Sequence, residues 1–290
     1  MWHRGVPNTS GLMRQMVSLN FDRRERQSDN RLRLRVQDKD GVVSRHLVEA
    51  ERRTAARGGE TGSNGLLLDP DGNLVLCQHG DRRVSRLRKN WSFEPMATHY
   101  DGKRLNSPND AIYHSNGDLY FTDPPYGLEK RMDDPAKELP FQGVYRLPKG
   151  ATAPVLLTKD VTRPNGIGFS PDEKKLYVAS SDPDKAIWMV YDVQDDGSIA
   201  NGKVFFDSTA WFKEGRPGLP DGLKVDKQGN IFATGPGGVL VFAPDGTHLG
   251  TIETGQKTAN CGFGDDGSVL YMTADMFFCR IRLSTTGLGF

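Results

Sequence analysis

The sequence has few cysteines, almost no net charge and no long apolar run. Its 290 residues include three cysteines, 38 Lys and Arg, and 37 Asp and Glu, for a net charge of +1. A sparse, odd number of cysteines argues against a disulfide scaffold and predicts buried thiols in a reducing compartment. The charge balance gives no reason to expect a nucleic-acid partner. No apolar run is long enough to span a membrane and the first residues lack a signal-peptide core, so we expect no membrane partner and a cytoplasmic location.

Several catalytic motifs are also missing. There is no Gly-x-Ser-x-Gly nucleophile elbow, which argues against a serine hydrolase. There is no glycine loop of the phosphate-binding kind, although the chain has 33 glycines. No Cys or His pair has the spacing of a zinc site. Any chemistry is therefore expected to use carboxylates and neutral oxygen ligands.

A short module occurs five times along the chain. Each copy begins with Asn or Asp, runs through an alternating apolar strand and a turn with Gly or acidic residues, and ends in a second strand. The copies span residues 64–76, 109–121, 165–178, 221–233 and 260–272. Each pattern predicts a β-hairpin. The first residues are 45, 56, 56 and 39 positions apart, which is the spacing of propeller blades with loop insertions. We therefore predict an all-β propeller.

The first residues of the modules are expected to lie close together. In a propeller, equivalent residues of the inner strands lie at equivalent heights around a central channel. Four amides and one carboxylate would form a ring of oxygens, which suits Ca²⁺ or Mg²⁺. A single Asn-Gly pair is equally typical of a turn, so this prediction rests on the recurrence. The residues are Asn64, Asn109, Asn165, Asp221 and Asn260.

The start of the chain does not follow this pattern. Residues 1–60 carry 13 Lys and Arg against 8 Asp and Glu, and residues 1–29 show no sustained strand alternation. We predict a basic, disordered or atypical segment over residues 1–29 and a single propeller domain over residues 30–290. Within that domain, residues 32–48 again predict a hairpin, because alternating strands flank an Asp-Gly turn.

Six short motifs follow one another from about residue 60 to the C terminus. They occupy residues 63–66, 76–84, 106–110, 120–127, 163–167 and 219–222. In type and order they resemble the gluconolactonase group of the SMP-30/regucalcin-like family. The resemblance implies a six-bladed β-propeller with an incomplete or atypical first blade. It also implies a divalent cation in the channel mouth and hydrolysis of a sugar lactone, so we expect a hydrolase that acts on a cyclic ester.

The resemblance implies roles for individual residues. Asn165 corresponds to a metal ligand of the family, and Asp221 to a metal ligand that is also proposed as the general base. Asn109 is expected beside the metal, where it binds substrate or completes the coordination. Ca²⁺ is the expected cation, with Mg²⁺, Mn²⁺ and Zn²⁺ as alternatives.

Two further residues are candidates for substrate contact. His79 and Asp123 end the second strands of the first two modules, so they are expected near the channel. Histidine changes its charge near neutral pH, although a lone His is equally typical of a structural position. An Asp before Pro-Pro is equally typical of a turn. Arg82 and Arg83 are predicted either to dock a sugar acid or to be solvated charges on an edge strand.

One feature of the family is missing. The family has a glutamate ligand in a Glu-Gly-Pro motif, and this motif does not occur in the chain. Its absence leaves two alternatives open: a metal-binding or partner-binding propeller without turnover, and another propeller hydrolase of the paraoxonase or strictosidine-synthase kind. A start further upstream would explain the missing motif, the basic segment and the partial blade together, and would also hide any signal peptide. The sequence does not determine the lactone, the cation or the oligomeric state.

Overall fold

Alternating apolar residues and glycine-containing turns fold the chain into antiparallel sheets. The computed structural model describes residues 31–37, 43–49 and 62–290, with side chains for 62–290. In this part of the chain the only helices are η1 (Arg131–Asp133) and α2 (Thr209–Lys213). The predicted all-β class is therefore confirmed. The predicted segment over residues 1–29 lies outside the described residues.

Five sheets form the blades, four with four strands and the last with three. From the inner strand outward, the earliest of them contains β3 (Leu66–Leu68), β4 (Leu74–Gln78), β5 (Arg83–Leu87) and β6 (Phe93–Ala97). The next contains β9 (Ala111–Tyr113), β10 (Leu119–Asp123), β11 (Gly143–Leu147) and β12 (Val155–Thr158). The third contains β13 (Pro164–Phe169), β14 (Lys175–Asp182), β15 (Lys185–Val193) and β16 (Ile199–Asp207). The fourth contains β17 (Leu223–Val225), β18 (Ile231–Gly235), β19 (Gly238–Phe242) and β20 (His248–Glu253). The last contains β21 (Thr258–Gly264), β22 (Val269–Ala274) and β23 (Phe277–Arg282).

The predicted hairpins are all present. Each module forms the two inner strands of a blade, as the pairs β3–β4, β9–β10, β13–β14, β17–β18 and β21–β22. The hairpin predicted over residues 32–48 is confirmed as β1 (Arg31–Gln37) paired with β2 (Val43–Glu49). A short ribbon of β7 (His99–Tyr100) and β8 (Lys103–Arg104) lies between the β3–β6 and β9–β12 blades in sequence.

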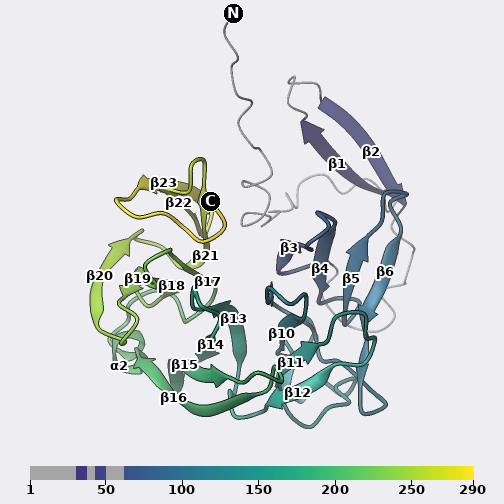
Figure 1. Cartoon of the computed structure of the whole chain (residues 1–290), viewed down its shortest axis with the longest axis horizontal. Coiled ribbons are helices and arrows are strands. Elements are labelled where there is room, and N and C mark those ends of the chain that lie inside the picture. Colours follow the sequence, from purple (N-terminus) through teal and green to yellow (C-terminus); the bar gives the residue numbers. More distant parts are fainter. Residues whose placement is uncertain (1–30, 38–42, 50–61) are drawn as a thin grey trace, which may run out of the picture.

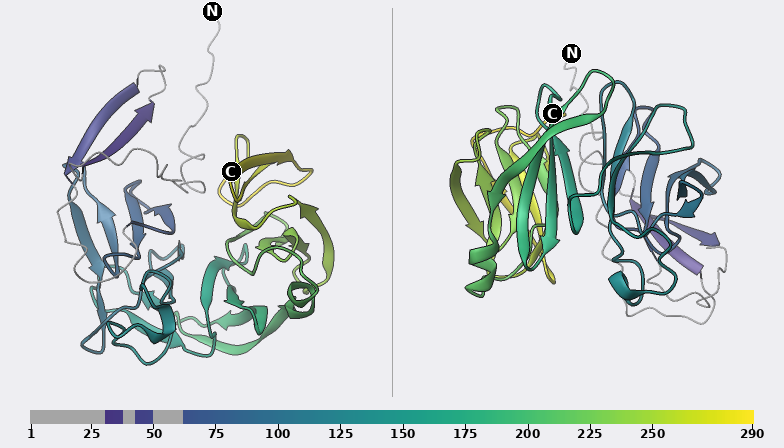
Figure 2. Two further views of the ribbon diagram at one scale, coloured as in Figure 1. Left: turned by 180° about the vertical axis from the view of Figure 1, so that it is seen from behind. Right: turned by 90° about the horizontal axis from the view of Figure 1, so that it is seen from below.

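The five blades follow one another along an arc, with the inner strands toward the middle (Figures 1 and 2). The inner strands of consecutive blades pack against each other, β3 against β9, β9 against β13, β13 against β17 and β17 against β21. This arrangement confirms a propeller with five blades. The sixth blade of the predicted fold is not confirmed.

Apolar side chains fill the space between each pair of neighbouring blades. Phe121 and Tyr145 pack with Val75 between the β3–β6 and β9–β12 blades. The other three interfaces hold similar clusters, of which the largest surrounds the buried Trp188. Because burial of apolar area is the main favourable term in folding, these interfaces hold each blade at a fixed position relative to the next.

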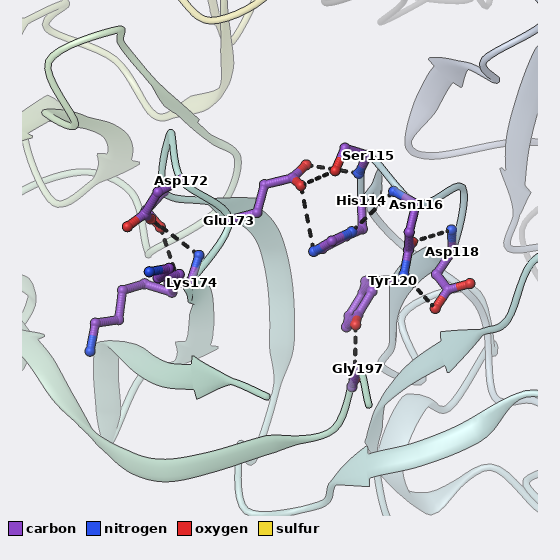
Figure 3. A network of polar contacts seen from close by, with 11 residues as sticks. His114, Ser115, Asn116, Asp118, Tyr120, Asp172, Glu173, Lys174 and Gly197 are labelled. Atoms are coloured by element: carbon purple, nitrogen blue, oxygen red, sulfur yellow. Dashed lines mark hydrogen bonds and ion pairs between the residues drawn. The ribbon is translucent and has the colours of Figure 1, made fainter. Parts of the chain in front are cut away.

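A polar contact adds a second link between two of the blades (Figure 3). Glu173, in the β13–β14 turn, accepts a hydrogen bond from the backbone N–H of Ser115 at 2.8 Å and one from its hydroxyl. Its Oε2 also lies 3.5 Å from Nε2 of His114, and both partners belong to the β9–β10 turn. The contact joins the ends of the inner hairpins that are farthest from Asn109 and Asn165.

The three cysteines are free thiols. Cys77 and Cys261 are buried, as predicted, but Cys279 is only partly buried because it lies on β23, the edge strand of the three-stranded blade. The prediction of a buried thiol is therefore wrong for Cys279. None of the helices in the described part of the chain is long and apolar enough to cross a membrane.

Candidate functional site

In three of the modules, the glycine after the lead residue packs against the lead residue of the next blade. A Cβ atom added to any of these glycines would lie only 2.1 to 2.6 Å from an oxygen of the next blade, closer than real contacts allow. The contacts are Gly65 with Asn109, Gly166 with Asp221, and Gly222 with Asn260. The glycine is therefore required because it lets the inner strands approach closely. This packing brings the inner strands together at these three pairs, and a ring formed by all five lead side chains stays a prediction.

Asn165 and Asp221 form the centre of the candidate site. The Asn165 side chain is 5% exposed, and its Nδ2 donates a 2.8 Å hydrogen bond to the hydroxyl of Ser181. The same side chain lies within hydrogen-bonding reach of the Asp221 carboxylate. Burial raises the pKa of Asp221 to about 8, and the neighbouring charge of Asp110 adds to the increase. Without a cation, this carboxyl group therefore holds its proton at neutral pH.

Asp110 is a second carboxylate in the site, and the sequence interpretation missed it. In the other four modules the residue after the lead position is Gly or Cys, whereas in the second module it is Asp110. Its Oδ1 accepts a hydrogen bond from the N–H of Ala111 at 2.9 Å, but its Oδ2 is buried without a well-formed hydrogen bond. Burial raises the pKa of Asp110, and the ammonium group of Lys224 opposes this. The acidic residue in place of Gly or Cys after the lead residue is the sequence signal that could have identified Asp110.

The remaining lead residues are placed less uniformly. Asn109 is 4% exposed, and its N–H donates to the carbonyl of Thr122 at 2.9 Å. Asn260 is partly buried, and its Oδ1 accepts from the N–H of Cys261. Asn64 is exposed. The structure thus brings Asp110, the neighbour of Asn109 in the chain, to the Asn165 and Asp221 pair, and the predicted metal or substrate contact of Asn109 stays a prediction.

Asp123 lies beneath the site with no exposed surface. Its Oδ2 accepts a 2.7 Å hydrogen bond from the N–H of Asn106, and its Oδ1 accepts a 2.8 Å bond from the N–H of Ser107. Burial raises the pKa of Asp123 to about 7, against the lowering effect of these two bonds. Both oxygens are therefore committed to holding the segment that leads to Asn109. This geometry supports a positioning role, and the predicted substrate contact of Asp123 stays a prediction.

Arg82 holds the same segment before Asn109 in place. Its side chain is 6% exposed, and its guanidinium donates to the carbonyl oxygens of Leu105 at 2.7 Å, Asn106 at 3.0 Å and Ala136 at 2.7 Å. The interpretation of Arg82 as a solvated charge is wrong, because its guanidinium is buried and bonded to three backbone carbonyls, and the docking of a sugar acid stays a prediction. The adjacent Arg83, at the start of β5, donates hydrogen bonds to the side chains of Gln78, at the end of β4, and Asp81, in the turn between the two strands.

The turn after β10 brings one more side chain toward the site. Tyr126 lies in this turn, beside Ser181 and within electrostatic range of Asp221, and the sequence interpretation missed it. The partly buried His79 packs against the same turn, since a Cβ on Gly127 would lie 2.7 Å from its carbonyl oxygen. The structure thus places His79 beside Gly127, and its contact with substrate stays a prediction.

The donor set fits a hard divalent cation. Across residues 62–290 there is no group of three or more His, Cys, Asp or Glu that could hold a metal, so a soft-metal site is not formed there. Instead, the amide of Asn165 lies with the two carboxylates of Asp110 and Asp221, and the Oδ2 atom of Asp110 is buried without a well-formed hydrogen bond. Two neighbouring carboxylates repel each other, and a bound cation would offset this repulsion. Carboxylate and amide oxygens are also the ligands that Ca²⁺ and Mg²⁺ prefer.

Comparison with known proteins gives a consistent family. The family model described as "SMP-30/Gluconolactonase/LRE-like region" matches residues 34–275. A gluconolactonase of Zymomonas mobilis is 40% identical over 243 residues, which cover 82% of this chain and 68% of that protein. The pentonolactonase XacC of Haloferax volcanii is 32% identical over 134 residues, which cover 45% of this chain and 44% of that protein.

Among solved structures, the chain is similar to one from Xanthomonas campestris that is described as a gluconolactonase important in glucose secondary metabolic pathways. The TM-score is 0.66 at 32% sequence identity, and the match covers 76% of this chain and 72% of that one.

Proposed function

Because the chain belongs to the SMP-30/gluconolactonase/LRE-like family, we propose that it hydrolyses a sugar lactone to the corresponding aldonic acid. The observation that carries this proposal is the contact between Asn165 and Asp221, with Asp110 beside them, at the point where three blades meet. These residues come from separate motifs, and the fold brings them together. The likeness to the gluconolactonases supports a small lactone as the substrate.

The proposed site includes one divalent cation. Asp221, Asn165 and Asn109 would hold it, with Ca²⁺ as the first choice and Mg²⁺, Mn²⁺ or Zn²⁺ as alternatives. When bound, the cation would supply positive charge for the carbonyl oxygen of the ester. The glutamate ligand of the family has no counterpart in a Glu-Gly-Pro motif here, and Asp110 adds a carboxylate near Asp221 instead.

The side chains provide the acid–base chemistry. Water adds to the carbonyl carbon of the lactone, and the bond from that carbon to the ring oxygen breaks. The Asp221 carboxylate accepts the proton of the water, and the ring oxygen becomes a hydroxyl group when it receives a proton. Asn165 is held by Ser181 and cannot rotate freely, so its amide can orient the substrate next to Asp221. Asn109 is expected to play the same part from the neighbouring blade.

We also propose that the complete propeller has six blades. The β1–β2 hairpin would form the outer half of the additional blade, which is then the incomplete or atypical first one. Support comes from its position in the chain directly before the β3–β6 blade and from its antiparallel pairing, which matches outer pairs such as β5–β6 in the other blades.

The test of the function is proton release from glucono-1,5-lactone. Metal-stripped protein should be inactive and should recover turnover when it is titrated with Ca²⁺, Mg²⁺, Mn²⁺ or Zn²⁺. A cation that raises the melting temperature without turnover would instead favour a metal-binding propeller, because binding to the folded state alone stabilises it. Turnover that is equal before and after chelation would contradict the metal requirement and leave the lactonase in place.

Metal binding is expected to depend on pH and to release a proton. The carboxyl group of Asp221 has a pKa of about 8 in the metal-free protein, so below pH 8 it is protonated and a cation must displace that proton. The apparent affinity for Ca²⁺ should therefore rise about tenfold per pH unit up to pH 8 and then level off. Calorimetric titration in two buffers with different ionisation enthalpies would measure the released proton. An affinity that is constant from pH 6 to pH 8 would contradict the prediction.

A further inference from the structure

A tyrosine from one blade reaches the candidate site formed by the next two. Tyr126 follows β10, three residues after Asp123. Its side chain lies beside the hydroxyl of Ser181 and within electrostatic range of the Asp221 carboxylate and the Arg163 guanidinium. Ser181 itself accepts the hydrogen bond of the Asn165 amide. The Tyr126 hydroxyl therefore lies next to the residues that are proposed to act on the ester.

This hydroxyl has no well-formed hydrogen bond, although its oxygen is buried. The hydroxyl of Ser181 lies nearby but can act toward Tyr126 only as an acceptor, because its single hydrogen already goes to the carbonyl oxygen of Pro220 at 2.5 Å. A buried polar group without a partner is unfavourable, and native structures rarely contain one without a reason. A ligand that brings a well-placed acceptor would take the hydrogen of the Tyr126 hydroxyl in a well-formed hydrogen bond.

The turn that carries Tyr126 is held from several sides. The hydroxyl of Ser107 donates to the carbonyl of Pro124 at 2.5 Å and accepts from the N–H of Gly127 at 2.8 Å. The N–H of Leu128 closes the turn on the carbonyl of Pro125 at 3.1 Å. At Gly127 there is no room for a side chain against the backbone of His79. Tyr126 is therefore presented in a fixed position, which is what precise recognition requires.

We propose that Tyr126 determines the specificity of the site, by donating a hydrogen bond from its hydroxyl to a ring hydroxyl of a polyhydroxylated lactone. This inference rests on the proposed function. A tyrosine hydroxyl is protonated at neutral pH and can donate. Asp221 and Asn165 are occupied by the ester, which leaves Tyr126 for the hydroxyl groups of the sugar. A site built to bond a substrate hydroxyl rejects an analogue that lacks it.

The first test compares two lactones. In Tyr126→Phe, kcat/KM for glucono-1,5-lactone should fall by about tenfold or more, mainly through KM, because one hydrogen bond to substrate is lost. The kcat/KM for δ-valerolactone, which has no hydroxyl groups, should be nearly unchanged. The matched control is Tyr271→Phe, which removes a hydroxyl that bonds to the exposed Asp265 in the last blade, and it should leave both substrates unaffected. An equal loss with both lactones, or no loss with either, would overturn the inference.

A binding measurement separates this inference from the proposed function. D-gluconate serves as the probe, titrated by calorimetry into the wild type and into Tyr126→Phe, with circular dichroism to verify folding. The variant should bind it about tenfold more weakly. If the wild type binds gluconate but hydrolyses no lactone, the proposed function fails while weaker binding by the variant still supports the role of Tyr126. Hydrolysis with equal gluconate binding by both proteins would overturn only the role of Tyr126. A wild type that neither binds nor hydrolyses would overturn both.

Discussion

Replacement of Asp221 with Asn is expected to lower kcat for glucono-1,5-lactone by about a thousandfold. The substitution keeps the shape of the side chain but removes the negative charge and the basic oxygen, so the attacking water loses its proton acceptor. The change should appear mostly in kcat, because the substrate is held by neighbouring groups such as Asn165. Stopped-flow measurement of proton release, with the cation at saturating concentration, would determine the effect.

The matched control is Asp245→Asn, in the same blade. Asp245 is an exposed turn residue that accepts a 2.9 Å hydrogen bond from the N–H of Thr247, and its replacement should leave turnover near that of the wild type. If Asp221→Asn retained more than about a tenth of the wild-type kcat, Asp221 would not be the general base.

The stability of the same variant provides an independent readout. In the metal-free protein, burial and Asp110 raise the pKa of Asp221 to about 8, whereas an unfolded Asp titrates near 4. Between these two values the folded state binds more protons than the unfolded state, so this carboxyl group makes the wild type less stable as the pH rises from about 4 to about 8. Asn has no such titration. Relative to the wild type, the melting temperature of metal-free Asp221→Asn should therefore rise as the pH increases over this range.

The substitution with the largest expected cost in stability is Asp123→Ala. It leaves the N–H groups of Asn106 and Ser107 buried without acceptors. Each unpaired group costs about 1–3 kcal/mol, so we expect the free energy of unfolding to fall by about 3 kcal/mol and the melting temperature to fall by roughly 10 °C. Turnover should fall as well, because the loop that leads to Asn109 and the turn that carries Tyr126 both depend on this carboxylate. Urea denaturation and steady-state kinetics would measure the two effects.

A matched control separates the two consequences. Asp226 is also fully buried, and its Oδ1 accepts hydrogen bonds from the N–H groups of Gln228 at 2.9 Å and Asn230 at 2.8 Å, in the β17–β18 turn. Asp226→Ala should lose a similar amount of stability, yet its folded molecules should retain kcat/KM. If the two variants lost activity equally per folded molecule, Asp123 would have no special part in positioning the site.

The comparison of Asp123 with Asp110 shows why the site could be predicted only in part. Its position at the end of a predicted strand identified Asp123 as a residue near the channel, but only the folded loops show that both of its oxygens bond to the segment before Asn109. Asp110 is adjacent to a predicted residue, yet its importance depends on the carboxylate of Asp221 from a blade more than a hundred residues away in the chain. Contacts between such distant segments leave no regular spacing in the sequence.

The sequence by itself determined the hairpins, because strand alternation and turn chemistry act over a few residues, and it also identified Asn109, Asn165 and Asp221 as lead residues of a repeat. Only the tertiary structure decided how the strands of the five described blades are ordered and packed. It also decided that the buried Arg82 binds backbone carbonyls and that Tyr126 reaches Ser181 on the neighbouring blade. These properties depend on how loops of separate blades meet, and the packing of whole sheets fixes that arrangement.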